Sequence, residues 1–103
     1  MGKLFIIGAG PGAVAHLTDV ARQAIAASAV VVGYDNYLEQ IKPLINGKEI
    51  VSTGMMREVE RCREAIRRAR SGETVSLVSG GDAGIYGMAG LVFELLENEV
   101  AGA

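Results

Sequence analysis

Two glycine-rich segments hold the residues best suited to binding a small molecule. Residues 8–12 read GAGPG and residues 79–87 read SGGDAGIYG, and each segment follows a short apolar run, at 4–7 and 75–78. Glycine has no Cβ, so a ligand can approach its backbone closely. In open α/β sheets, ligands bind beyond the carboxyl ends of the strands, where such loops emerge. The pair of loops therefore predicts a nucleotide-like ligand.

A dinucleotide-binding domain is one interpretation of the first loop. Residues 8–13 match the relaxed fingerprint G-x-G-x-x-[GA], and Asp35 stands where a ribose-binding carboxylate would follow the next strand. That fingerprint works because a helix begins inside it and directs its N-terminus at a pyrophosphate. Here Pro11 disfavours helical backbone at Gly10, and the first good N-cap is Thr18. We therefore expect an extended loop and a ligand without a pyrophosphate, with an NAD(P)-binding Rossmann-type domain as the alternative.

The elements that position these loops alternate between apolar runs and helical patterns. Helices are predicted at 18–28, 36–42, 56–70 and 86–98, and strands at 3–7, 29–33, 49–51 and 74–79. Asn46-Gly47 is a turn signal before the third strand. This alternation predicts an α/β fold with an open, mostly parallel sheet of four to five strands flanked by helices.

Composition narrows the possible partners and the cellular setting. The chain has 103 residues, of which 50% are hydrophobic and 21% charged, as expected for one soluble globular domain. A formal net charge of -2 gives no basic field for nucleic acid, and no apolar run is long enough to span a membrane. The N-terminus does not resemble a signal peptide, and the single cysteine cannot form an internal disulfide. We expect a cytoplasmic protein.

The predicted helix at 56–70 carries one apolar stripe, formed by Val59, Cys62, Ile66 and Ala69. Cys62 is therefore interpreted as a small core residue rather than a nucleophile. Neither Cys62 nor His16 has metal-ligand spacing around it, so no metal site is expected. The arginines of this helix are interpreted as a solvated face with Glu60–Arg63 and Glu64–Arg68 ion pairs. Attraction of an anionic substrate is the alternative role for these arginines.

The motifs and their order resemble the opening of the tetrapyrrole methylase family. The stretches that carry this resemblance are 4–12, Leu17-Thr18, 30–32 and 79–82. Within the family, 32–38 (VGYDNYL) and 81–90 (GDAGIYGMAG) are most similar to the branch that methylates precorrin-3B at ring carbon 17 in cobalamin biosynthesis. The resemblance covers essentially the whole chain. It implies an enzyme that transfers a methyl group from S-adenosylmethionine to a tetrapyrrole (precorrin) substrate.

The resemblance also implies which residues contact the cofactor. These residues are Gly10, Pro11, Gly12, Gly81, Asp82, Ala83 and Tyr86. S-adenosylmethionine has no phosphate, so open glycine loops can bind it through backbone groups without a cationic cradle. Asp82 has a second possible role, which is to cap a helix that begins near Tyr86. Ala83 departs from the proline usual in the family, although it suits this branch.

Asp35 is the candidate catalytic base. Related enzymes carry an acidic residue just after the second strand, and Asp35 is the nearest match. Gly33 shifts the register by one residue, so a solvated loop aspartate is the competing interpretation. Ala13 also departs from several relatives, which place an aspartate directly after Gly-Pro-Gly.

The family is bilobed, with the cofactor between its lobes. The resemblance therefore implies that residues 1–103 form the N-terminal lobe and that the second lobe is absent from this chain. We expect this lobe to fold but to be inactive alone, and the full-length enzyme to be a homodimer. A non-enzymatic α/β module remains as a third interpretation, favoured if neither cofactor binds.

Overall fold

The sheet is parallel throughout its described strands. A computed structural model of the chain describes residues 2–8, 13–54 and 58–80, together with residues 90, 92, 95 and 96. Its strands are β1 (Lys3–Gly8), β2 (Val30–Tyr34), β3 (Glu49–Thr53) and β4 (Thr74–Ser79). Their spatial order is β1-β4-β2-β3, and every pair is parallel. The predicted α/β fold is confirmed.

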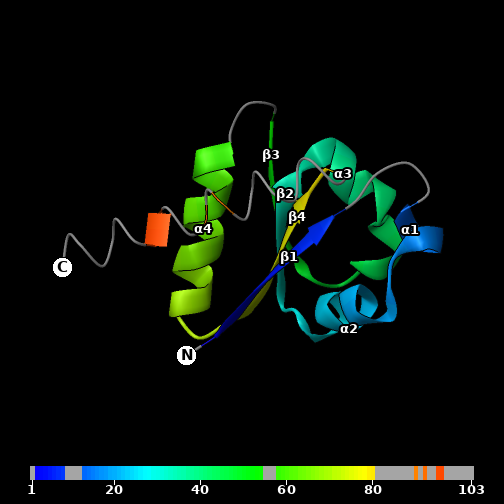
Figure 1. The fold of residues 1–103 in the computed structure, drawn as a ribbon, viewed down its shortest axis with the longest axis horizontal. Coiled ribbons are helices and arrows are strands. Elements are labelled where there is room, and N and C mark those ends of the chain that lie inside the picture. The colour runs from blue at the N-terminus through cyan, green and yellow to red at the C-terminus, as the bar shows by residue number, and fades with distance from the viewer. Residues whose placement is uncertain are drawn as a thin grey trace.

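Helices cover both faces of this sheet. The helical elements in chain order are α1 (Ala13–His16), α2 (Asp19–Ala27), α3 (Asp35–Gln40), the 3-10 helix η1 (Lys42–Leu44) and α4 (Glu58–Arg70). Figure 1 shows α4 on one side of the sheet and α1, α2 and α3 on the other. The described part of the chain therefore has three layers, α/β/α.

Each face of the sheet has its own hydrophobic core, because side chains alternate along a strand. On β2, Val31 packs on the α2 and α3 side, while Val30 and Val32 pack on the α4 side. All three valines are essentially inaccessible to solvent. A strand covered on both faces is continuously apolar, as the sequence of β2 predicted.

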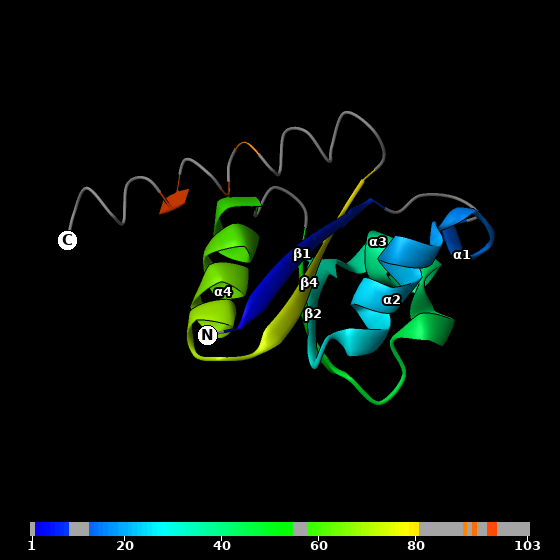
Figure 2. The same cartoon turned by 60° about the horizontal axis from the view of Figure 1, so that its bottom comes forward.

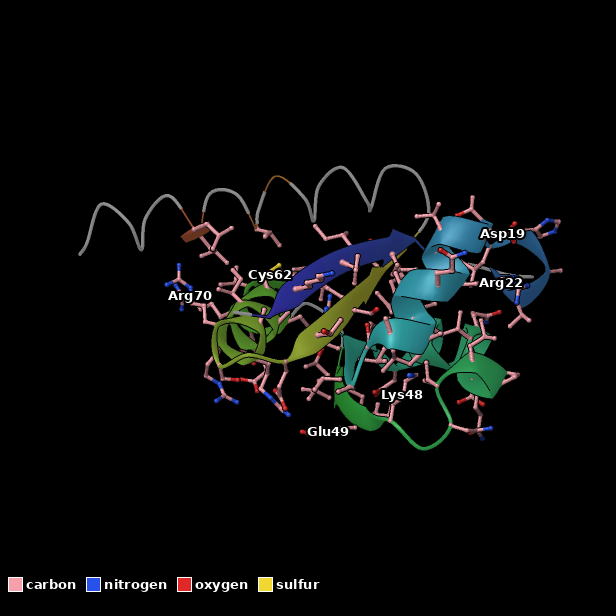
Figure 3. The ribbon with its side chains drawn as sticks, turned by 90° about the horizontal axis from the view of Figure 1, so that it is seen from below. Asp19, Arg22, Lys48, Glu49, Cys62 and Arg70 are labelled. Atoms are coloured by element: carbon pink, nitrogen blue, oxygen red, sulfur yellow. The ribbon has the colours of Figure 1, made fainter. Side chains whose placement is uncertain are left out.

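One turn of helix was not predicted. The sequence predicted extended chain up to Thr18, whereas α1 begins at Ala13, directly after the first glycine loop. Alanine favours helix, and the Arg22 guanidinium from α2 donates a hydrogen bond to the Val14 carbonyl, which a short helix leaves unpaired. Figure 3 shows Arg22 on the part of α2 that lies beside α1. The predicted N-cap is confirmed: Thr18 Oγ1 accepts from the Ala21 N–H at 3.1 Å.

The buried stripe of α4 differs from the prediction by one position. Cys62 and Ile66 are buried as expected, but the prediction for Val59 was wrong, since 41% of this residue is exposed. The side chains buried by α4 are Arg61, Cys62, Ala65 and Ile66. The helix thus presents two adjacent rows to the sheet, 61/65 and 62/66, and Val59 lies outside both.

Candidate functional site

The two glycine loops leave the sheet from neighbouring strands. β1 pairs with β4 in a register that places Gly8 opposite Ser79, the last residues of the two strands. Figure 2 shows β1 and β4 side by side, with their arrowheads at the same edge of the sheet. This carboxyl edge is where ligands bind in open α/β sheets. The fold therefore brings together the starting points of two loops that are far apart in sequence.

The predicted cofactor contacts themselves lie outside the described residues. This holds for both loops, and the residues concerned are Gly10, Pro11, Gly12, Gly81, Asp82, Ala83 and Tyr86. Their roles stay predictions. The described residues at the start of the loops are Gly8, Ser79 and Gly80, and none of these carries a charge.

Gly80 is the first residue after β4, and Tyr37 of α3 packs against it. A Cβ added at Gly80 would lie 2.6 Å from the Tyr37 hydroxyl oxygen and 2.8 Å from its Cζ. Atoms at such distances overlap, so any side chain at this position would displace the tyrosine ring. The sequence predicted Gly80 as part of a ligand-binding loop, and the structure adds that its missing side chain makes room for Tyr37.

Two further side chains extend this contact across the carboxyl edge. The Tyr37 ring meets the Tyr34 ring edge-on, with centroids 5.4 Å apart and planes 83° apart. The guanidinium carbon of Arg61 lies 6.0 Å from the centroid of Tyr34, at the limit of a cation–π contact. Tyr34 ends β2 and Tyr37 lies one helical turn beyond it on α3. The contacts therefore run from α4, over the end of β2, to the end of β4.

Arg61 is buried beneath this edge, with 4% of the residue exposed. Its Nη1 donates to Thr53 Oγ1 at 2.7 Å and to the Gly54 carbonyl at 3.1 Å. A carboxylate oxygen of Glu58 lies 3.7 Å from Nη2. Sequence analysis assigned the arginines of this helix to a solvated face, so Arg61 is a correction. Its only signal in sequence is its place beside Cys62 on the inner side of an amphipathic helix.

Asp35 is the first residue of α3 and is exposed. It lines an open groove of about 470 Å³ between α3, η1 and the edge strand β3. The lining includes Glu39 and Lys42, which form an ion pair at 3.8 Å, and Ser52 of β3. No described residue of β1 or β4 lines this groove. The structure thus places Asp35 at the same edge as the glycine loops but beside a groove on the β3 side, and its role as a base stays a prediction.

At the opposite edge of the sheet, the charges of α4 pair with carboxylates. Arg68 donates two hydrogen bonds to Glu49, at 2.6 and 2.5 Å, and further hydrogen bonds to Glu73. These hydrogen bonds lower the pKa of both glutamates below their ordinary value of 4.5 and raise the pKa of Arg68. The predicted Glu64–Arg68 pair is confirmed at 3.8 Å. This pairing supports the interpretation of an ion-paired face at Arg68.

Cys62 is a core residue, as the sequence predicted. It is fully buried against the α4 side of the sheet, and burial raises the pKa of its thiol to about 11. Figure 3 labels it on α4. In the part of the chain that the structure describes, no group of three or more His, Cys, Asp or Glu side chains could hold a metal ion. Likewise, no helix among those residues is long and apolar enough to cross a membrane.

Comparison with known proteins gives a consistent result. The profile of the Tetrapyrrole (Corrin/Porphyrin) Methylases family matches residues 3–103. A cobalt-factor III methyltransferase from Priestia megaterium is 52% identical over 95 residues, which is 92% of this chain and 18% of that protein. A probable cobalt-factor III C(17)-methyltransferase from Salmonella typhimurium strain LT2 is 49% identical over 96 residues, which is 93% of this chain and 40% of that protein.

The fold has a solved counterpart. The crystal structure of the methyltransferase CobJ superposes with a TM-score of 0.83 at 33% sequence identity, covering 100% of this chain and 43% of that one. The chain therefore spans less than half the length of each of these relatives.

Proposed function

Because this chain belongs to the tetrapyrrole (corrin/porphyrin) methylase family, we propose that residues 1–103 form the N-terminal lobe of an S-adenosylmethionine-dependent C-methyltransferase of cobalamin biosynthesis. The observation that carries the proposal is the pairing of β1 with β4, from which both glycine loops leave the sheet side by side. The match to the family profile favours this function over a dinucleotide-binding domain or a non-enzymatic module.

The described residues fit such a cofactor. The groups at the start of the two loops, Gly8, Ser79 and Gly80, are small and uncharged, which suits a ligand without phosphate. When bound, S-adenosylmethionine supplies a methyl group on a positively charged sulfur. We assign its contacts to backbone groups of both loops, at Gly10, Pro11, Gly12, Gly81, Asp82, Ala83 and Tyr86.

Positioning is the main task of the protein in this reaction. Methyl transfer to a ring carbon is a displacement, so its rate depends on the alignment of donor and acceptor. The two loops would hold the donor at the edge of β1 and β4. Asp35, at the end of β2, is the candidate group to accept a proton from the acceptor after attack. Its groove on the β3 side is open enough to admit a substrate carboxylate or amide side group.

Ring carbon 17 is the methylation site that we propose. The names of the bacterial relatives point to cobalt-factor III as the substrate, and residues 32–38 and 81–90 resemble the precorrin-3B branch. The full-length enzyme should transfer labelled methyl from S-adenosylmethionine to one of these two macrocycles, and NMR of the product would locate the new methyl group. Transfer to neither macrocycle, or to another carbon, would contradict the proposal.

The role of Asp35 has a direct test. Asp35→Asn removes the proton acceptor while preserving size, so we expect kcat of the full-length enzyme to fall by about 10²-fold, with little change in affinity for S-adenosylmethionine. Glu39→Gln is the matched control, because Glu39 lies on the same helix and lines the same groove. Equal kcat values for wild type and Asp35→Asn would show that Asp35 is a solvated surface residue.

The division into lobes carries its own expectation. Residues 1–103 alone should fold but should neither bind S-adenosylmethionine at micromolar concentration nor turn over a tetrapyrrole. Calorimetry of this chain beside the full-length protein tests the difference, and micromolar binding by the chain alone would contradict it. We place the full-length enzyme in the cytoplasm as a homodimer, and analytical ultracentrifugation tests its oligomeric state.

A further inference from the structure

Two arginines of α4 contact opposite ends of the same sheet. Arg61 and Arg68 are separated by about two helical turns, so they project from the same side of the helix. Arg68 binds Glu49 at the start of β3 and Glu73, which directly precedes β4. Arg61 binds Thr53 and Gly54, at the end of β3. One arginine therefore holds the amino edge and the other the carboxyl edge, where the glycine loops begin.

The two arginines differ in how well their charge is compensated. Arg68 is paired with three carboxylates, those of Glu49, Glu64 and Glu73. Arg61 is buried, its nearest carboxylate oxygen is 3.7 Å away, and no hydrogen-bond acceptor reaches its Nε within the described residues. A buried polar group without a partner costs free energy. An apolar side chain of similar length would serve stability better at this position.

What Arg61 does provide is a connection across the carboxyl edge. Its guanidinium contacts the Tyr34 ring, that ring contacts Tyr37, and Tyr37 occupies the space beside Gly80. We call these four residues, Arg61, Tyr34, Tyr37 and Gly80, the edge stack. It joins the ends of β3, β2 and β4, and it stops at the first residue of the second glycine loop.

We propose that Arg61 is a positioning residue: through Tyr34 and Tyr37 it fixes the direction in which the second glycine loop leaves β4. The catalytic consequence rests on the proposed function, because that loop would hold the methyl donor. A small displacement of a positioned reactant costs a large factor in rate, so loss of the edge stack should slow methyl transfer although none of its side chains supplies a reacting group.

The test compares Arg61→Met with Arg68→Gln in the full-length enzyme. We expect Arg61→Met to keep or raise the melting temperature, to raise KM for S-adenosylmethionine about tenfold and to lower kcat about tenfold or more. Arg68→Gln should lower the melting temperature and leave KM and kcat unchanged. Arg61→Lys keeps the charge but not the planar group that lies against Tyr34, so we expect an intermediate KM. Wild-type KM and kcat in Arg61→Met would overturn the proposal.

Coupling between members of the stack gives a second test. If Arg61 acts through Tyr37, then Tyr37→Ala should raise KM as Arg61→Met does, and the double variant should be no worse than the poorer single variant. Multiplied effects would show that the two residues act independently, against the proposal. Should Arg61→Met fail to fold, Arg61→Lys and Tyr37→Ala still decide the question through the same KM comparison.

Hydrogen exchange separates this proposal from the proposed function. In Arg61→Met, amides in peptides covering 34–38 and 79–80 should exchange faster than in wild type, while those covering 49–51 and 73–75 should not change. Arg68→Gln should give the reverse pattern. An enzyme that methylates neither macrocycle would refute the proposed function and leave this exchange result to stand. Unchanged exchange at 34–38 and 79–80 would refute the edge stack, whatever the enzyme's activity.

Discussion

Gly33 lies within β2 at a point where α3 and β4 both come close. A Cβ at this residue would lie 3.0 Å from Cδ2 of Leu38, 3.2 Å from Cβ of Val78 and 3.2 Å from the Val78 carbonyl oxygen. The strand backbone cannot yield easily, because Gly33 pairs with Val78 in the sheet. We expect Gly33→Ala to lower the free energy of unfolding by about 1–3 kcal/mol through overpacking.

Urea unfolding of the two proteins would measure this difference. Gly54→Ala is the control, since nothing lies within 4 Å of a Cβ added there and its backbone needs no special conformation. Equal losses in the two variants would contradict the packing explanation.

Cys62 gives a prediction about chemical reactivity. Its thiol is fully buried and its pKa is raised to about 11, so at pH 8 it is protonated and shielded from reagents. We expect an aromatic disulfide reagent to leave Cys62 unmodified in the folded protein and to modify it fully in denaturant. Peptide mass spectrometry identifies the modified residue. Modification within minutes under native conditions would be inconsistent with the core position.

At the scale of elements, the junction of α4 with β3 and β4 predicts a pH dependence. Hydrogen bonds from Arg68 lower the pKa values of Glu49 and Glu73 in the folded state. A lowered folded pKa means that the stabilisation is complete above the unfolded value of about 4.5 and is lost as pH falls through the folded pKa. The difference in unfolding free energy between wild type and Arg68→Gln should therefore be constant at pH 6–7 and shrink toward pH 3.

Urea titrations at several pH values would follow this difference. Added salt should reduce it as well, because the glutamates are partly exposed and their interaction with Arg68 is screened. A difference that grows on acidification would contradict the assignment.

Most elements could be predicted because their signals are local. β4 occupies the predicted residues 74–79, and Thr18 caps α2 as expected. The burial of Arg61 could not be predicted, because helical periodicity counts arginine as polar. Only the position of Thr53 and Tyr34 in space shows what this side chain contacts. The same holds for Tyr37 and Gly80, which are neighbours through tertiary packing alone.

The order of the strands is likewise beyond local signals. Four parallel strands can be arranged in several orders, and periodicity is the same in each. β4 lies between β1 and β2, so it pairs with both, while β1 has no other strand partner among the described residues. The adjacency of the two loops, on which the proposed function rests, depends on this insertion.

At the scale of the whole molecule, β4 should be essential for the sheet to form. A chain that stops after Gly72 lacks β4 and leaves β1 separated from β2 and β3. We expect it to show no cooperative thermal unfolding by circular dichroism, whereas residues 1–103 should unfold in one transition. A cooperative transition in the shorter chain would show that β2, β3 and their helices fold without the central strand.

The position of β4 also has a consequence for protein synthesis. Of the four described strands it leaves the ribosome last, although it belongs between two strands that emerge earlier. Until then the nascent chain exposes the apolar flanks of β1 and β2, so it is during translation, rather than in the finished protein, that a chaperone has most to protect. The methyl-donor pocket would then appear only when this last strand is inserted, which ties the onset of cofactor binding to the completion of folding.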